Sequence, residues 1–178
     1  MSRFASERLR RLTPYVPGEQ PRDKKYIKLN TNENPYYVSG RAVDAITESS
    51  IKNLKLYSDP ECAVLVKAIA EFYGTDEDEV MATNGSDEAL TFCFAAYGGN
   101  GVVFADVTYG FYGVLAALCG CPVKTVPLRR DFTIDPADYF DSGCTVVIAN
   151  PNAQTGIGLS AEKLESIIAN NVDNIVII

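Results

Sequence analysis

The feature that most constrains this fold is a series of short, continuous apolar runs rich in β-branched residues. Thr145–Ala149 and Ile175–Ile178 are the clearest, because neither run alternates between apolar and polar positions. Strands buried on both faces have this pattern, which is typical of parallel sheets covered by helices. The predicted strands are 80–83, 102–105, 123–126, 145–149 and 175–178.

Helical segments separate most of these strands. The spacing of apolar residues predicts helices over 86–97, 109–119 and 160–170, with a short one near 135–141. Strands that alternate with helices indicate βαβ units. We therefore predict an α/β fold with a mostly parallel sheet flanked by helices.

The first third of the chain has a different pattern. We predict a short basic helix over 2–12, a strand at Tyr26–Leu29 and a helix from Ser39 to about Asn53. A clear amphipathic helix follows Asp59-Pro60, and Gly74 stands where a left-handed C-terminal cap would be.

Composition excludes several classes of function. The 178 residues carry a formal net charge of −7, which is the wrong sign for a nucleic-acid-binding surface. No apolar run reaches the roughly 20 residues that a membrane helix needs. The basic N-terminus lacks the apolar core of a signal peptide. We expect a cytoplasmic protein with no membrane or nucleic-acid partner.

Histidine is absent, so this chain supplies no histidine base or metal ligand. The five cysteines are odd in number and include no C-x-x-C pair, which predicts neither a disulfide framework nor a metal site. Cys93, Cys119 and Cys144 lie in apolar stretches, and we interpret them as small buried side chains. Any chemistry would then be supplied by a cofactor or completed by residues elsewhere.

Three polar segments lie next to predicted strands, and each has two interpretations. Asn84–Glu88 opens a helix, where it would bind a phosphate or merely cap the helix. Tyr109 follows a strand, where it would stack on a flat ring or pack in the core. The turn 150–156 would donate amides to a ligand or serve as an ordinary loop. The segments 29–35 and 56–60 are, taken alone, common turn sequences.

Together and in this order, five motifs resemble the N-terminal half of a fold-type-I aminotransferase that uses pyridoxal 5′-phosphate (PLP), and more narrowly the histidinol-phosphate aminotransferase branch. The motifs are L-N-T-N-E-N-P, Y-S-D-P, N-G-S-D-E, T-Y-G-F-Y and N-P-N-A-Q-T-G. The resemblance implies the large domain of an aspartate aminotransferase-like fold, incomplete and preceded by an N-terminal arm. It places the arm or small-domain segment at 1–38 and the first part of the PLP-binding domain at 39–178.

The resemblance also implies roles for individual residues. Gly85, Ser86 and Asp87 would hold the cofactor phosphate, and Tyr109 would stack on the pyridine ring. Tyr57 would reach the cofactor phosphate of a partner subunit, which implies a homodimer. The substrate would contact two further residues, Tyr15 and Asn32.

The sequence departs from the family pattern in the last motif. Ala153-Gln154 stands where the family has Asn-Pro, so the amide that contacts the cofactor's O3′ is missing at its usual position. Asn152, one residue earlier, is the expected substitute. The Schiff-base lysine, the aspartate that pairs with the pyridinium nitrogen and the substrate-gripping arginines are expected beyond residue 178. We therefore expect no catalytic residue and no transamination from these 178 residues alone.

The implied reaction of the complete protein is transamination between L-histidinol phosphate and 2-oxoglutarate in histidine biosynthesis. Two alternatives remain open. One is a related PLP enzyme, such as a threonine-phosphate decarboxylase or an aromatic-amino-acid aminotransferase. The other is a non-catalytic half-domain that is stable only with a partner.

Overall fold

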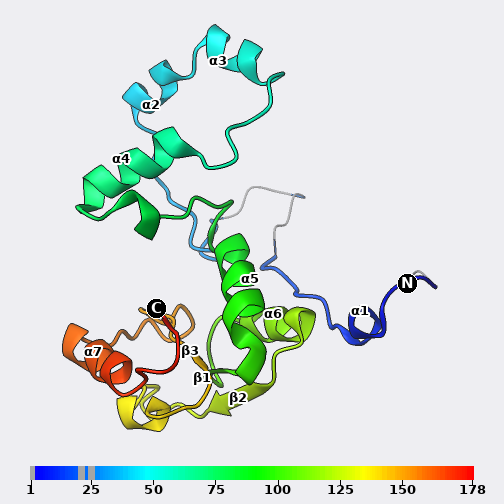
Figure 1. Ribbon diagram of the computed structural model, residues 1–178, viewed down its shortest axis with the longest axis vertical. Helices are drawn as coiled ribbons and strands as arrows, with labels where there is room; N and C mark the ends of the chain where they lie inside the picture. Colours follow the sequence, from blue (N-terminus) through cyan, green and yellow to red (C-terminus); the bar gives the residue numbers. More distant parts are fainter. Residues whose placement is uncertain (1–2, 20–22, 24–26) are drawn as a thin grey trace. The chain divides into compact units, whose positions relative to one another are not determined.

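The computed structural model in Figure 1 describes residues 3–19, 23 and 27–178. The chain divides into two compact units. One unit comprises Met1–Tyr15 and Asn84–Ile178, and the other comprises Val16–Thr83. The second unit is thus inserted into the sequence of the first. The predicted division at residue 38 stays a prediction.

The first unit is built on a parallel sheet with the strand order β2-β1-β3-β4. Its strands are β1 (Val102–Ala105), β2 (Val123–Val126), β3 (Thr145–Val147) and β4 (Val176–Ile177). Val102 of β1 is in register with Val123 on one side and Thr145 on the other. The predicted parallel sheet is confirmed, and four of the five predicted strands belong to it.

The fifth predicted strand, 80–83, is wrong, because these residues form no strand in the part of the chain that the structure describes. Val80 does have an extended backbone, with φ −116° and ψ 130°. A strand also needs a neighbour with which to exchange backbone hydrogen bonds. The apolar pattern is consistent with the extended backbone of Val80 but contained no information about a pairing partner.

Both faces of the sheet are covered, as the continuous apolar runs predicted. Val102 and Phe104 pack with Phe94 of α5 (Ser86–Tyr97) and Leu115 of α6 (Phe111–Cys119). The opposite face carries a second cluster whose members are Val103, Val126, Tyr139, Cys144, Val146, Ile148 and Ile167. Ile167 belongs to α7 (Ala161–Ala169), and Figure 1 shows α7 on the other side of the strands from α5 and α6.

Other elements of the first unit are shorter than predicted. The predicted helix over 2–12 is confined to α1 (Glu7–Arg11), where the Ser6 hydroxyl accepts the N–H of Leu9. The predicted helix 109–119 begins only at Phe111. The short helix near 135–141 is a 3-10 helix, η3 (Pro136–Tyr139), and a second one, η2 (Gly98–Asn100), follows α5.

The second unit contains α2 (Gly40–Ala45), α3 (Glu48–Asn53), α4 (Ala63–Tyr73) and the 3-10 helix η1 (Glu77–Glu79). The single helix predicted from Ser39 is broken because Thr47 accepts the N–H of Ser50 and starts α3. Gly74 ends α4 at φ 70°, as predicted. Tyr26 of the predicted strand lies outside the described residues, and residues 27–29 form no strand.

The cysteines are all unpaired within the described chain. Cys144 is buried, as predicted, whereas Cys93 and Cys119 are only half-buried. The predicted burial therefore holds only in part for these two, although Cys119, at the end of α6, packs against the first core cluster. No helix in the described ranges combines the length and apolar character needed to cross a membrane.

Candidate functional site

The candidate site of the first unit lies at the carboxyl edge of the sheet. All strands of this sheet run parallel, so the loops that follow the strands emerge at the same edge of the sheet. The loop after β1 spans residues 106–110, and the loop after β3 includes residues 150–159. The predicted motifs around Tyr109 and Asn152 occupy these two loops.

Gly85 gives α5 an unusual start. Its backbone has φ 75° and ψ −180°, a region that is essentially restricted to glycine. Among the described residues, no side chain caps this helix. An α-helix leaves the N–H groups of its first turn without intrahelical partners, and its dipole favours an anion there. Glu88 braces the turn, since its carboxylate accepts the N–H of Asn84 at 2.7 Å.

Asp87 and Tyr109 join this helix start to the loop after β1. The Tyr109 hydroxyl donates to the Asp87 carboxylate, at 3.1 Å from Oδ1 and 3.3 Å from Oδ2. Burial and the neighbouring carboxylate raise the pKa of Tyr109 to about 12. The hydrogen bond to Tyr109 turns the Asp87 carboxylate toward the tyrosine. An anion at the start of α5 would therefore meet backbone N–H groups and the Ser86 hydroxyl.

Tyr15 completes an aromatic cluster around Tyr109. The centroids of the Tyr15 and Tyr109 rings lie 6.0 Å apart in an edge-to-face arrangement. Tyr15 also contacts Phe111 at 5.6 Å, and Tyr109 contacts Tyr112 at 5.5 Å. The N-terminal arm therefore brings one predicted substrate-binding residue to a predicted cofactor-binding residue.

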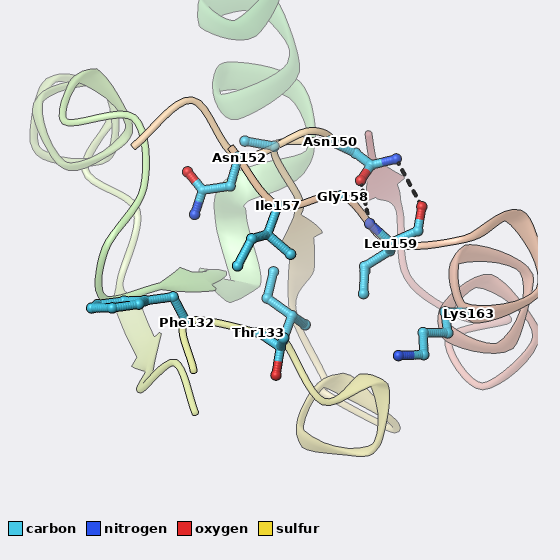
Figure 2. Close-up of a pocket in the computed structure, with 10 residues that line it drawn as sticks. Phe132, Thr133, Asn150, Asn152, Ile157, Gly158, Leu159 and Lys163 are labelled. Carbon is cyan, nitrogen blue, oxygen red and sulfur yellow. Dashed lines mark hydrogen bonds between the residues drawn. The ribbon is translucent and has the colours of Figure 1, made fainter. Parts of the chain in front are cut away.

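Asn152 is buried, with 3% of its surface exposed, and it links the two loops. Its side-chain nitrogen donates to the carbonyl oxygen of Val107 at 2.7 Å. Asn150 instead closes its own loop, accepting the N–H of Leu159 at 2.7 Å. Figure 2 shows the two asparagine side chains directed to opposite sides of the loop.

A small cavity lies beside this loop, between residues 132–134 and α7 (Figure 2). Its lining includes Phe132, Ile157 and Lys163. Its volume of about 30 Å³ is far below the roughly 300–1,000 Å³ of a typical small-molecule pocket, so a ligand with an aromatic ring and a phosphate does not fit there. We take the surface formed by α5 and the loop after β1 as the candidate site, because Asp87 and Tyr109 meet there.

The structure brings Gly85, Ser86, Asp87, Tyr109 and Tyr15 into one unit with Asn152. The other two predicted residues, Tyr57 and Asn32, belong to the inserted unit. Tyr57 is 99% exposed, and Asn32 has a left-handed backbone at φ 52°. Their predicted roles stay predictions.

Sequence reasoning missed Asp106, which is the first residue after β1. Its carboxylate accepts the N–H of Leu128 at 3.0 Å and so ties the loop after β1 to the loop after β2. A carboxylate directly after a buried strand was the available signal. The Val107 carbonyl was missed as well, and a backbone group has no signature in a sequence.

The start of α5, the aromatic cluster and the buried Asn152 lie in one unit, and comparison with known proteins identifies the family of the chain. The family described as aminotransferase class I and II matches residues 24–178. The chain belongs to this family. The Thermus thermophilus aspartate aminotransferase tetra mutant 1 has the same fold, with a TM-score of 0.77 and 21% identity over 97% of this chain and 48% of that chain.

Curated relatives narrow the comparison. A histidinol-phosphate aminotransferase from Marinomonas sp. is 48% identical over the whole chain and 51% of its own length. One from Clostridium acetobutylicum is 46% identical with the same coverage. The chain thus spans about half the length of the curated relatives it matches. An aminotransferase structure from Mycobacterium tuberculosis is 25% identical, with a TM-score of 0.61 over 72% of this chain and 36% of that chain.

Proposed function

We propose that this chain is the cofactor-phosphate-binding half of a PLP-dependent aminotransferase that acts on L-histidinol phosphate and 2-oxoglutarate. The observation that carries the proposal is the pairing of Asp87 with Tyr109 at the start of α5, in a chain of the aminotransferase family. The names of the relatives support the substrate.

The residues present fit such a cofactor. Gly85 has no side chain, so its backbone can come close to an anion. Its backbone conformation, with φ 75°, would strain any other residue. Ser86 adds a hydroxyl donor, and the first-turn N–H groups of α5 add backbone donors. Bound PLP supplies an electron sink for the substrate's α-carbon.

Tyr109 would orient the ring of the cofactor, with its own hydroxyl held by Asp87. Tyr15 touches the Tyr109 ring, so its hydroxyl would meet the substrate's phosphate next to the cofactor. Asn32 would line the substrate side. Tyr57 would cross a homodimer interface to the partner's cofactor phosphate. Asn152 would stand in for the amide missing at residue 153.

The cofactor half of the proposal is tested by titrating PLP into a protein of the relatives' full length. Ser86→Ala removes a hydrogen bond to a charged group and should weaken PLP about tenfold to a hundredfold. Ser166→Ala, in α7 on the other side of the sheet from α5, is the matched control and should bind like wild type. Equal affinity for both variants would overturn the phosphate site.

The substrate half needs a panel of amino donors with 2-oxoglutarate as acceptor, read as glutamate formed. L-Histidinol phosphate should be the preferred donor. Preference for an aromatic amino acid would replace the proposed substrate, and carbon dioxide release from threonine phosphate would replace the proposed reaction. If the protein binds no PLP, the alternative of a non-catalytic half-domain would replace the proposed function.

A further inference from the structure

Asn152 has a fixed orientation within its own loop. Its backbone N–H donates to the carbonyl of Ile157 at 2.9 Å, and its carbonyl accepts the N–H of Gly156 at 2.7 Å. Its side-chain oxygen accepts the N–H of Gln154 at 3.3 Å. These bonds and its burial leave the side chain little freedom.

The side-chain nitrogen of Asn152 is directed out of this loop. It donates to the carbonyl of Val107, two residues before Tyr109. Val107 is 40% exposed, so its own side chain gives this backbone little anchoring. The side-chain amide of Asn152 therefore holds the backbone of the loop after β1 against the loop after β3, in which Asn152 itself is fixed.

The loop after β1 is held from its other side as well. Asp106 accepts the N–H of Leu128 from the loop after β2. The segment 106–107 is thus fastened between both neighbouring strand ends. Tyr109 follows directly, and Asp87 fixes its hydroxyl.

We propose that Asn152 is a positioning residue that fixes Tyr109 through the Val107 carbonyl. This role rests on the proposed function, in which Tyr109 orients the cofactor ring. It is separate from any contact that Asn152 itself makes with the cofactor. The missing amide at residue 153 would then be a second, independent difference from the family pattern.

The first measurement needs no cofactor. Hydrogen–deuterium exchange of residues 107–110 should be about threefold to tenfold faster in Asn152→Ala, because a buried hydrogen bond is lost. Asn152→Asp has the same shape and keeps the acceptor for Gln154 but lacks the donor, so it should show the same change. Asn150→Ala is the matched control, since it opens the same loop without touching Val107. Equal exchange at 107–110 in all three variants and wild type overturns the proposal.

The second measurement asks how Asn152 affects PLP affinity in the full-length protein. Asn152→Ala should weaken binding about threefold to tenfold more in the wild-type background than in Tyr109→Ala, where only a direct contact of Asn152 with the cofactor would be left to lose. An equal loss in both backgrounds would mean that Asn152 acts only through such a direct contact, which overturns the positioning role. If no variant and no wild-type protein binds PLP, the proposed function fails, while the exchange measurement still decides whether Asn152 fixes Tyr109.

Discussion

The Asp87 carboxylate and the Tyr109 hydroxyl, 22 positions apart in sequence, share a hydrogen bond of 3.1 Å that links the start of α5 to the loop after β1. Ionisation of the phenol would place a second negative charge beside the carboxylate. This repulsion adds to burial in raising the pKa of Tyr109 to about 12.

Asp87→Asn should lower the pKa of Tyr109 toward the ordinary value of 10.0. Ring-labelled tyrosine followed by NMR measures this, and Tyr109→Phe assigns the resonance. The pKa of Tyr109 should fall while the signals of exposed tyrosines such as Tyr57 stay unchanged. No change at Tyr109 would contradict the contact.

The same pair makes stability depend on pH. Between about pH 10 and 12 the folded chain keeps the Tyr109 proton while the unfolded chain releases it. The free energy of unfolding should therefore fall as pH rises through this window. Denaturant titrations at several pH values should show a shallower fall for Tyr109→Phe than for wild type.

Gly85 and Gly113 offer a matched pair of substitutions. In both, an added Cβ would meet nothing within 4 Å, so the difference between them comes from the backbone. Gly85→Ala should cost about 1–3 kcal/mol because of its φ of 75°. Gly113→Ala lies inside α6 and should gain about 0.5–1 kcal/mol. Urea unfolding of both variants gives the comparison, and a neutral Gly85→Ala would contradict the strained helix start.

Tyr139 buries its hydroxyl without a hydrogen-bond partner among the described residues. Its ring is only 1% exposed, and its backbone carbonyl accepts a bond from the Asn171 side chain at 2.8 Å. Tyr139→Phe removes only the hydroxyl and should leave stability unchanged or raise it by about 1 kcal/mol. Tyr139→Ala should lose about 3–5 kcal/mol. A clear loss in the phenylalanine variant would indicate a bound water at the hydroxyl.

Tyr57 tests the predicted homodimer. Tyr57→Phe should weaken PLP binding about tenfold to a hundredfold while the dimer persists. Mixing these subunits with subunits that lack the Schiff-base lysine creates one site with an intact lysine and a partner's Tyr57. That site should bind PLP like wild type, because in an isologous dimer its Tyr57 comes from the partner subunit, which keeps the tyrosine. Cofactor loss equal to the Tyr57→Phe homodimer would mean that the tyrosine acts within its own subunit.

The sequence predicted the elements whose signal is local. Val102–Ala105 and Thr145–Val147 are strands because their β-branched runs suit burial on both faces. Gly74 ends α4 because a left-handed cap needs glycine. The break before Glu48 escaped prediction because one threonine does not by itself end a helix, although threonine is favoured as an N-cap over a helix interior.

The candidate site was predicted as a set of residues and not as a geometry. The motifs named Asp87 and Tyr109, but their hydrogen bond depends on how α5 packs beside β1. The bond from Asn152 to Val107 spans 45 positions and ends on a backbone oxygen, which every residue possesses. Pairings of this kind are set by tertiary packing, and a pattern of residue types does not specify them.

The docking of residues 3–15, the described part of the N-terminal arm that belongs to the first unit, has a kinetic consequence. Arg8 donates to the carbonyl of Leu118 at 3.3 Å, and these residues stand 110 positions apart. Closing so long a loop costs more chain entropy than forming any neighbouring βα unit. The arm should therefore dock last during folding and detach first under mild denaturant. Tyr15 belongs to the arm and contacts Tyr109 and Phe111. The aromatic cluster around Tyr109 should therefore form and unfold in a separate step from the sheet.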